Sequence, residues 1–408
     1  MKNLFLSVAV LLMCAFSAIA QVTTTYFEGK DAFKSLPALR QQQSKEISTK
    51  RMPKFDTEKL LWEDRENEGM DIPYRFGYGF DVSYSLNDGT WEELDSVRIW
   101  SLKISSPGAY SLNFIFEELW LCQDAQLYIF NTEGSMVYGP VTEKQNIKSG
   151  KFLTSLLVGD EVIIQLTEPF NSKEKSALKI SKVIHAYQNS IWCFLFGIGC
   201  SSSNSCPHND INCYPEWSNE SDAVAMVLVS SSQGEATALC TGSLLNNTAQ
   251  DYRPFFLTAF HCIDIETNWF GCPDRDLSPN EIAMAEEWLF QFRYKKTSCN
   301  GSATSTIINY NGADLRAAWH ETDFALMELR QPVYDAPITF LGWDRSGAIS
   351  SKGTGIHHPG GQPMKISFDN HSLVTNGNIL EFGNEQGDIC YSMPANRHWA
   401  VGFDNGTC

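Results

Sequence analysis

A histidine directly before a cysteine constrains this chain more than any other feature of its sequence. His261 and Cys262 close the apolar, β-prone run Phe-Phe-Leu-Thr-Ala-Phe, and Cys240 precedes them at the start of Cys-Thr-Gly-Ser-Leu-Leu. A disulfide between the two cysteines would pin the loop that carries the histidine. Because a general base needs its imidazole held in one orientation, the pattern indicates a catalytic histidine on a β scaffold.

The start of the chain predicts export. Residues 1–20 read as a signal peptide, with Lys2 as the positive start, an apolar run at 4–16 and Ala-Ile-Ala at 18–20 before the cleavage point. The apolar run is too short to span a bilayer, and no later segment approaches 18 uninterrupted apolar residues. We therefore expect a secreted protein that has no membrane segment in its mature form.

Export also explains the cysteine content. Of twelve cysteines, Cys14 falls in the signal peptide, so an odd number reaches an oxidising compartment where disulfides are the default. One cysteine is then a free thiol, part of an intermolecular bridge, or without its partner.

Length and charge narrow the class of protein. With 408 residues, of which 43% are hydrophobic, the chain can hold two domains that each have a core. Its formal net charge of −17 argues against a nucleic-acid partner, because that affinity comes mainly from Lys and Arg on phosphates.

Changes in composition divide the exported chain into four parts. Residues 21–74 are charged and polar and predict a solvated leader. Short alternating runs separated by turns at 75–192 predict a β-sandwich or jelly roll. Residues 193–205 are small, polar and flexible, as in a linker and processing region. A second strand-rich domain follows at 206–408, so the expected fold class is all-β.

Within this second domain the apolar runs predict four strands and one helix. The expected strands are 223–229, 254–259, 324–329 and 336–341. The expected helix is 280–292, where Ile282, Ala285, Leu289 and Phe292 lie near one helical face.

An acid suited to orient His261 lies at the head of one predicted strand. Asp323 precedes the run Phe-Ala-Leu-Met-Glu-Leu. A serine protease needs a nucleophile, an imidazole that takes its proton, and a carboxylate that fixes the imidazole tautomer. The alternatives are a structural role for His261 and a strand-end cap at Asp323.

These motifs resemble chymotrypsin-fold serine proteases, whose histidine region reads Thr-Ala-x-His-Cys after Cys-x-Gly-Ser-Leu. The Asn-Asn-Thr after the leucines, Ser-Cys-Pro at 205–207 and Gly-Ile-His-His-Pro at 355–359 resemble the bacterial lysyl endopeptidase branch. The resemblance implies a double β-barrel over 206–408, with the strand-rich region before it as a prodomain. It also implies a secreted, monomeric endopeptidase that cleaves polypeptides through an acyl-enzyme and needs no cofactor, with His261 as base and Asp323 as its orienting acid. A preference for lysine follows from the analogy alone.

The same resemblance implies two disulfides, Cys213–Cys299 and Cys240–Cys262, and leaves Cys206 without a partner. It assigns no partner to the remaining exported cysteines, which are Cys122, Cys193, Cys200, Cys272, Cys390 and Cys408.

The nucleophile is missing from the pattern. No Gly-x-Ser-Gly sequence occurs after residue 300. We expect that the chain stops shortly before the serine loop of the family and that these 408 residues alone are inactive. The alternative is a pseudoprotease that binds or scaffolds other proteins.

A metal site is not expected. His320-Glu-Thr-Asp-Phe324 begins like the zinc motif His-Glu-x-x-His but has phenylalanine in place of the second histidine. His357 and His358 are adjacent, so they point to opposite sides of a strand and rarely bind one ion together.

Overall fold

The computed structural model describes residues 21–27, 32–36, 46–66, 74–188, 208–230, 237–266, 273–333, 336–383 and 389–404. The expected signal peptide and the linker at 193–205 lie outside these residues. Strands dominate the described chain, which confirms the predicted all-β class. No described helix has the length and apolar character needed to cross a membrane.

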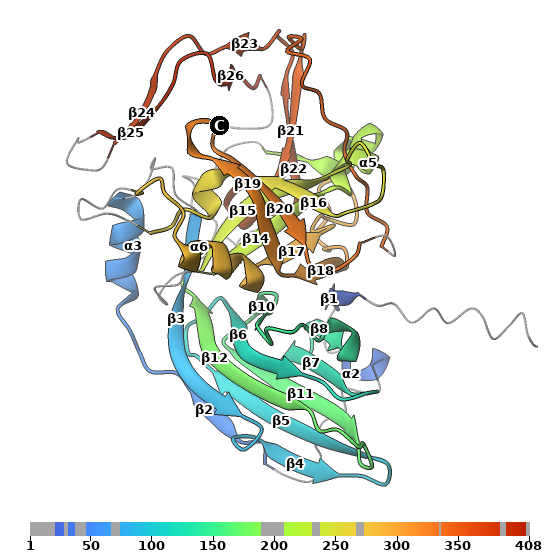
Figure 1. Cartoon of the computed structure of the whole chain (residues 1–408). Helices are drawn as coiled ribbons and strands as arrows, with labels where there is room; N and C mark the ends of the chain where they lie inside the picture. The colour runs from blue at the N-terminus through green and yellow to red at the C-terminus, as the bar shows by residue number, and fades with distance from the viewer. Residues whose placement is uncertain are drawn as a thin grey trace, which may run out of the picture.

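Two antiparallel sheets build the N-terminal half (Figure 1). The first sheet is centred on β12 (Ala177–Ala186), which pairs with β3 (Tyr74–Ser85) and β6 (Ser111–Trp120), and β6 extends to β9 (Phe152–Leu153) and β10 (Leu157–Val158). The second is centred on β11 (Glu161–Pro169), between β5 (Val97–Ser105) and β7 (Gln126–Asn131), with β4 (Thr90–Glu93) and β8 (Met136–Val141) outside them. Both sheets contribute to one buried core, which includes Trp100, Phe114 and Ile164.

The C-terminal half contains one open run of antiparallel pairings, β18-β17-β14-β15-β16-β20-β19. Their bounds are Val224–Ser230 (β14), Thr237–Leu245 (β15), Phe255–Thr258 (β16), Leu289–Phe292 (β17), Ile307–Asn311 (β18), Ala313–Trp319 (β19) and Phe324–Leu329 (β20). Alternate residues of these strands pack into a second core, which includes Phe256, Phe290 and Met327.

Three smaller groups of strands complete the C-terminal half. β22 (Lys365–Asp369) pairs with β13 (Asn209–Asp210) and β21 (Gly353–His357). Two separate ribbons pair β23 (Val374–Thr375) with β26 (Trp399–Ala400) and β24 (Leu380–Gly383) with β25 (Ile389–Met393).

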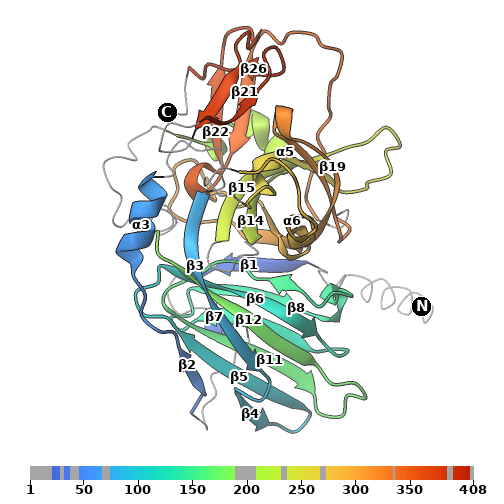
Figure 2. The ribbon, with the colours of Figure 1, turned by 60° about the vertical axis from the view of Figure 1, so that its left-hand side comes forward.

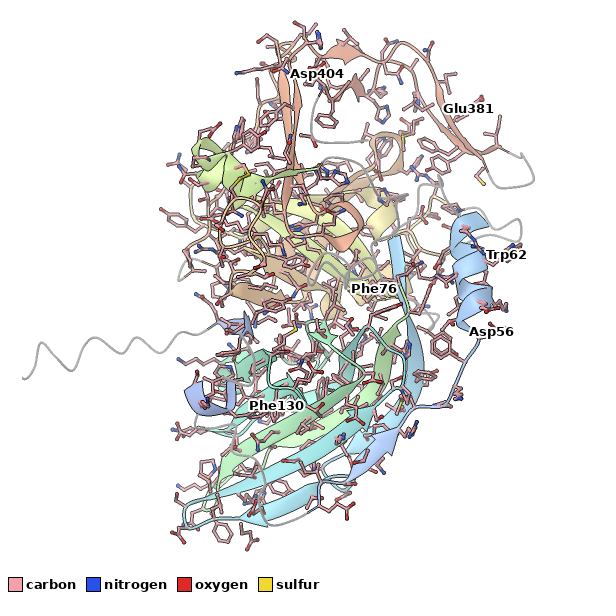
Figure 3. All side chains as sticks on the ribbon, turned by 180° about the vertical axis from the view of Figure 1, so that it is seen from behind. Asp56, Trp62, Phe76, Phe130, Glu381 and Asp404 are labelled. Atoms are coloured by element: carbon pink, nitrogen blue, oxygen red, sulfur yellow. A yellow bond between two sulfur atoms is a disulfide. The ribbon has the colours of Figure 1, made fainter. Side chains whose placement is uncertain are left out.

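The two halves are joined by strands that belong to both. β1 (Val22–Tyr26) pairs with β8 on one edge and with β18 on the other, and it lies between the halves in Figure 2. β3 pairs with β12 and also reaches β15. A third apolar core includes residues from both halves, among them Phe76, which lies near the start of β3 and is labelled in Figure 3.

The segment 21–74, expected to be a solvated leader, instead holds several regular elements. They are β1, α2 (Ala32–Ser35), β2 (Thr49–Arg51) and α3 (Thr57–Glu66). Val22 is 2% exposed because it packs into the N-terminal core. β1 has a neighbouring strand on each edge, and β2 pairs in parallel with β5. Composition misled here because polar side chains such as Thr24 are satisfied inside the junction.

Two other expectations for the C-terminal half were wrong. The helix expected at 280–292 ends early: α6 (Pro279–Met284) passes into a 3-10 turn at Ala285–Glu287, and β17 follows. All four residues of β17 are buried between β14 and β18, so pairing overrides the helical spacing. The described residues of 336–341 form no strand and only an isolated bridge at Leu341.

Candidate active site

The pairing of β16 with β20 brings His261 and Asp323 together. Thr258, the last residue of β16, lies opposite Ala325 near the start of β20. His261 lies in the 3-10 turn just after β16, and Asp323 lies between the turn His320–Thr322 and β20. Two loops distant in sequence therefore meet at one edge of the sheet.

Three hydrogen bonds join the two loops. His261 Nδ1 lies 2.9 Å from Asp323 Oδ2, and the His261 backbone N–H donates to Asp323 Oδ1 at 2.9 Å. The backbone N–H of Phe260 donates to the Asp323 carbonyl at 3.1 Å. A carboxylate at Oδ2 favours the tautomer with hydrogen on Nδ1, which leaves the Nε2 lone pair available to accept a proton.

The backbone at Asp323 is in the left-handed region, with φ 48° and ψ 41°. Asp and Asn adopt this conformation more readily than other residues that have a Cβ. The turn lets one carboxylate accept from both the His261 main chain and the His261 ring. Each of the two side chains is 23% exposed, so the pair is partly shielded yet open to a substrate.

A disulfide fixes the histidine loop to the sheet. Cys240 and Cys262 are bonded, with Cα atoms 6.3 Å apart, and both are buried. The Thr258 hydroxyl adds a hydrogen bond of 3.0 Å to the Thr241 carbonyl. The loop that carries His261 is thus held to β15 by the disulfide, and the end of the strand that leads into this loop is held to β15 by the Thr258 hydrogen bond.

The other cysteines have varied states. Cys213 and Cys299 form a second disulfide that spans 86 residues. Cys390 is also disulfide-bonded, whereas Cys122 is a buried thiol that donates to Glu168 Oε2 at 3.8 Å. The other cysteines, including Cys206, lie outside the described residues.

Two buried acidic residues behind the histidine loop, together with the largely buried Arg275, escaped the sequence analysis. Glu281 is fully buried, and its carboxylate accepts from the backbone N–H groups of Ile265 and Glu266, each at 2.8 Å. Asp264 is also fully buried, and burial together with the nearby Glu281 carboxylate raises its pKa to about 7, although Arg275 opposes the shift. The capping-box sequence Ser278-Pro-Asn-Glu281 was the one local signal that could have identified part of this group.

Other histidines of the described chain differ in their burial and in the groups that they contact. His358 is 5% exposed, and burial lowers its pKa to about 4. His185 is 3% exposed, with Nδ1 2.8 Å from Ser106 Oγ, and burial likewise lowers its pKa to about 4. His320 stacks on Trp319 beside Asp323, and the His357 ring is 6.4 Å from that of His208.

Comparison with known proteins gives these features a family. Residues 200–408 match the sequence model of the lysyl endopeptidase C-terminal domain. A lysyl endopeptidase of Pseudomonas aeruginosa is 26% identical over 240 residues, which are 55% of this chain and 46% of that protein. The chain therefore spans about half the length of this curated relative. The family resemblance predicted from the sequence motifs is confirmed, and the chain belongs to the lysyl endopeptidase family.

Proposed function

We propose that this protein is a secreted serine endopeptidase in which His261 is the general base and Asp323 orients it. The observation that carries the proposal is that two hydrogen bonds join the pair: the Asp323 carboxylate accepts from both the ring and the main chain of His261. In this role His261 Nε2 removes the proton of the nucleophile hydroxyl and later delivers it to the leaving amine. Asp323 holds the tautomer and stabilises the imidazolium.

We extend the proposal to the organisation of the chain. Residues 206–408 are the peptidase domain, and the strand-rich region at 75–192 is a prodomain released by cleavage within 193–205. Cleavage of polypeptides after lysine is proposed because the relative is named a lysyl endopeptidase. The mature enzyme is proposed to act as a monomer.

The test uses the protein as its natural gene encodes it and a lysyl amide substrate, with inhibition by a serine-directed phosphonate as the class marker. His261→Ala should abolish turnover. Asp323→Asn should lower kcat by about 10⁴ while the fold is retained, because the imidazole then adopts the wrong tautomer. His371→Ala is a matched control, since that ring is 76% exposed and lies on the turn after β22.

The outcomes separate the two function classes. Near-normal activity of Asp323→Asn would assign the orienting role to a different acid. Absence of turnover in the folded, processed full-length protein would replace the peptidase proposal by a binding or scaffolding function.

A further inference from the structure

Arg275 lies behind the histidine loop and contacts both loops of the candidate site. Its guanidinium is 5.1 Å from the ring centroid of Phe260 and 4.0 Å from that of Tyr391. Its Nη2 donates to the backbone carbonyl of His320. The side chain is only 10% exposed, so these contacts are made away from bulk water.

Each contact reaches a residue that determines where the pair lies. Phe260 immediately precedes His261, and its own N–H is bonded to the Asp323 carbonyl. The His320 carbonyl that accepts from Arg275 also accepts from the Asp323 N–H at 3.2 Å, closing the turn that carries the carboxylate. Arg275 therefore links Phe260, next to His261 in one loop, to the His320 carbonyl, which closes the turn that carries Asp323.

The stacking and the carbonyl bond hold the guanidinium more firmly than its ion pair does. Arg275 Nη1 is 4.0 Å from Asp264 Oδ2, which is at the limit of a salt bridge. A planar guanidinium can stack on an aromatic face and still donate in its own plane, whereas a lysine ammonium cannot do both. The position is thus built for arginine in particular.

The third contact of Arg275 is with the ribbon formed by β24 and β25. Tyr391 belongs to β25 and stacks on Phe382 of β24, with ring centroids 4.8 Å apart. This ribbon lies at the edge of the C-terminal half, and Figure 3 labels its residue Glu381. Arg275 therefore connects the two loops of the pair to a ribbon from a different part of the chain.

We propose that Arg275 is a positioning residue for the His261–Asp323 pair. It fixes the separation of the two loops through Phe260 and the His320 carbonyl, and Tyr391 of β25 covers it. The catalytic meaning of this inference rests on the proposed peptidase function, but the geometry it predicts can be measured without turnover.

The experiment follows the proton between His261 and Asp323 in the full chain labelled with ¹⁵N-histidine. A hydrogen-bonded Nδ1–H is expected as a low-field ¹H resonance that disappears in His261→Ala. Arg275→Gln and Arg275→Lys should both accelerate solvent exchange of this proton at least about tenfold, because neither residue can stack and donate as arginine does. Tyr391→Leu keeps the arginine and should give a smaller acceleration.

Arg330→Gln is the matched control. Arg330 is a partly buried arginine in the same half, with Nη2 2.8 Å from Asp314 and 2.9 Å from Glu286. Thermal midpoints measured beside the exchange rates distinguish loosening of the pair from general loss of stability. If Arg275→Gln does not fold, Tyr391→Leu carries the test.

Unchanged exchange in folded Arg275→Gln, or equal acceleration in Arg330→Gln, would overturn the proposal. Accelerated exchange confined to the Arg275 and Tyr391 variants supports it, even if the full-length protein cleaves no peptide; in that case only the proposed function fails. Where turnover is present, Arg275→Lys should lower kcat about 10²-fold and leave KM within about twofold. The reason is that a small displacement of the reacting groups slows the chemical step without weakening substrate binding.

Discussion

Protonation of buried His358 should make the folded protein sensitive to acid. Its ring stacks on Tyr294, with centroids 5.6 Å apart, and its Nδ1 is 2.9 Å from the Gln362 carbonyl, which it can reach only as an N–H donor. Nε2 is buried and has no hydrogen-bond partner in the described chain. A proton added at Nε2 would place a charge where nothing compensates for lost water.

The pKa sets the size and sign of this effect. Burial lowers the pKa of His358 to about 4, against about 6.5 in an unfolded chain. The native state therefore binds fewer protons between these values, so stability is present above pH 6.5 and is lost as the pH falls. The loss is about 2 kcal/mol by pH 5 and about 3 kcal/mol at pH 4 and below.

The assay is urea unfolding of the wild type and His358→Gln between pH 8 and pH 4.5. At pH 8 the variant should be less stable by about 1 kcal/mol, since it loses the ring stacking on Tyr294. Near pH 5 the order should reverse, because glutamine cannot be protonated and the wild type has lost about 2 kcal/mol. Parallel stability curves for the two proteins across this range would refute the reasoning.

Four further outcomes are expected. His185, in the N-terminal half, should contribute acid sensitivity as His358 does, because burial lowers the pKa of His185 to about 4. His185→Gln should therefore lose less stability in acid than the wild type; equal acid sensitivity of the two proteins would contradict this. Removing the disulfide by Cys240→Ser with Cys262→Ser should cost about 3 kcal/mol in denaturant unfolding, as the bond closes a loop with a sequence separation of 22. Burial, together with the Glu281 carboxylate, raises the pKa of Asp264 to about 7. The contribution of Asp264 to stability is therefore greatest below pH 4 and declines as the pH rises to 7. Asp264→Asn should abolish this decline in unfolding measured as a function of pH. Gln291→Leu should cost about 1–3 kcal/mol, read from unfolding midpoints, because the buried Gln291 amide donates to Ser155 at 2.7 Å across the junction and to Asn309 at 2.9 Å on the neighbouring strand β18.

Local sequence patterns were sufficient where one motif contained its own explanation. The run before His261 and the run after Asp323 both predicted strands, and β16 and β20 occupy these positions. Strands buried on one face alternate, so their period can be read directly. The requirements of a serine protease and the family resemblance, rather than the strand positions alone, then indicated that His261 and Asp323 act together.

The patterns failed where a residue depends on partners distant in sequence. β17 reads Leu-Phe-Gln-Phe with every residue buried, so it lacks the alternation that distinguishes a strand from a helix. No local signal reports that the guanidinium of Arg275 will lie against Tyr391. The polar composition of 21–74 likewise concealed β1, whose pairing partners β8 and β18 lie far from it in the sequence.

The double pairing of β1 has a consequence for the timing of folding. Asn309 donates to the Val22 carbonyl and to Thr24 Oγ1 across sequence separations of 287 and 285 residues. β1 therefore depends on a partner that follows almost three hundred residues later in the sequence. Contacts of such range close slowly because the chain entropy is lost before the contact forms. The joint between the two halves can therefore close only after most of the chain is available, so its formation is a late step of folding.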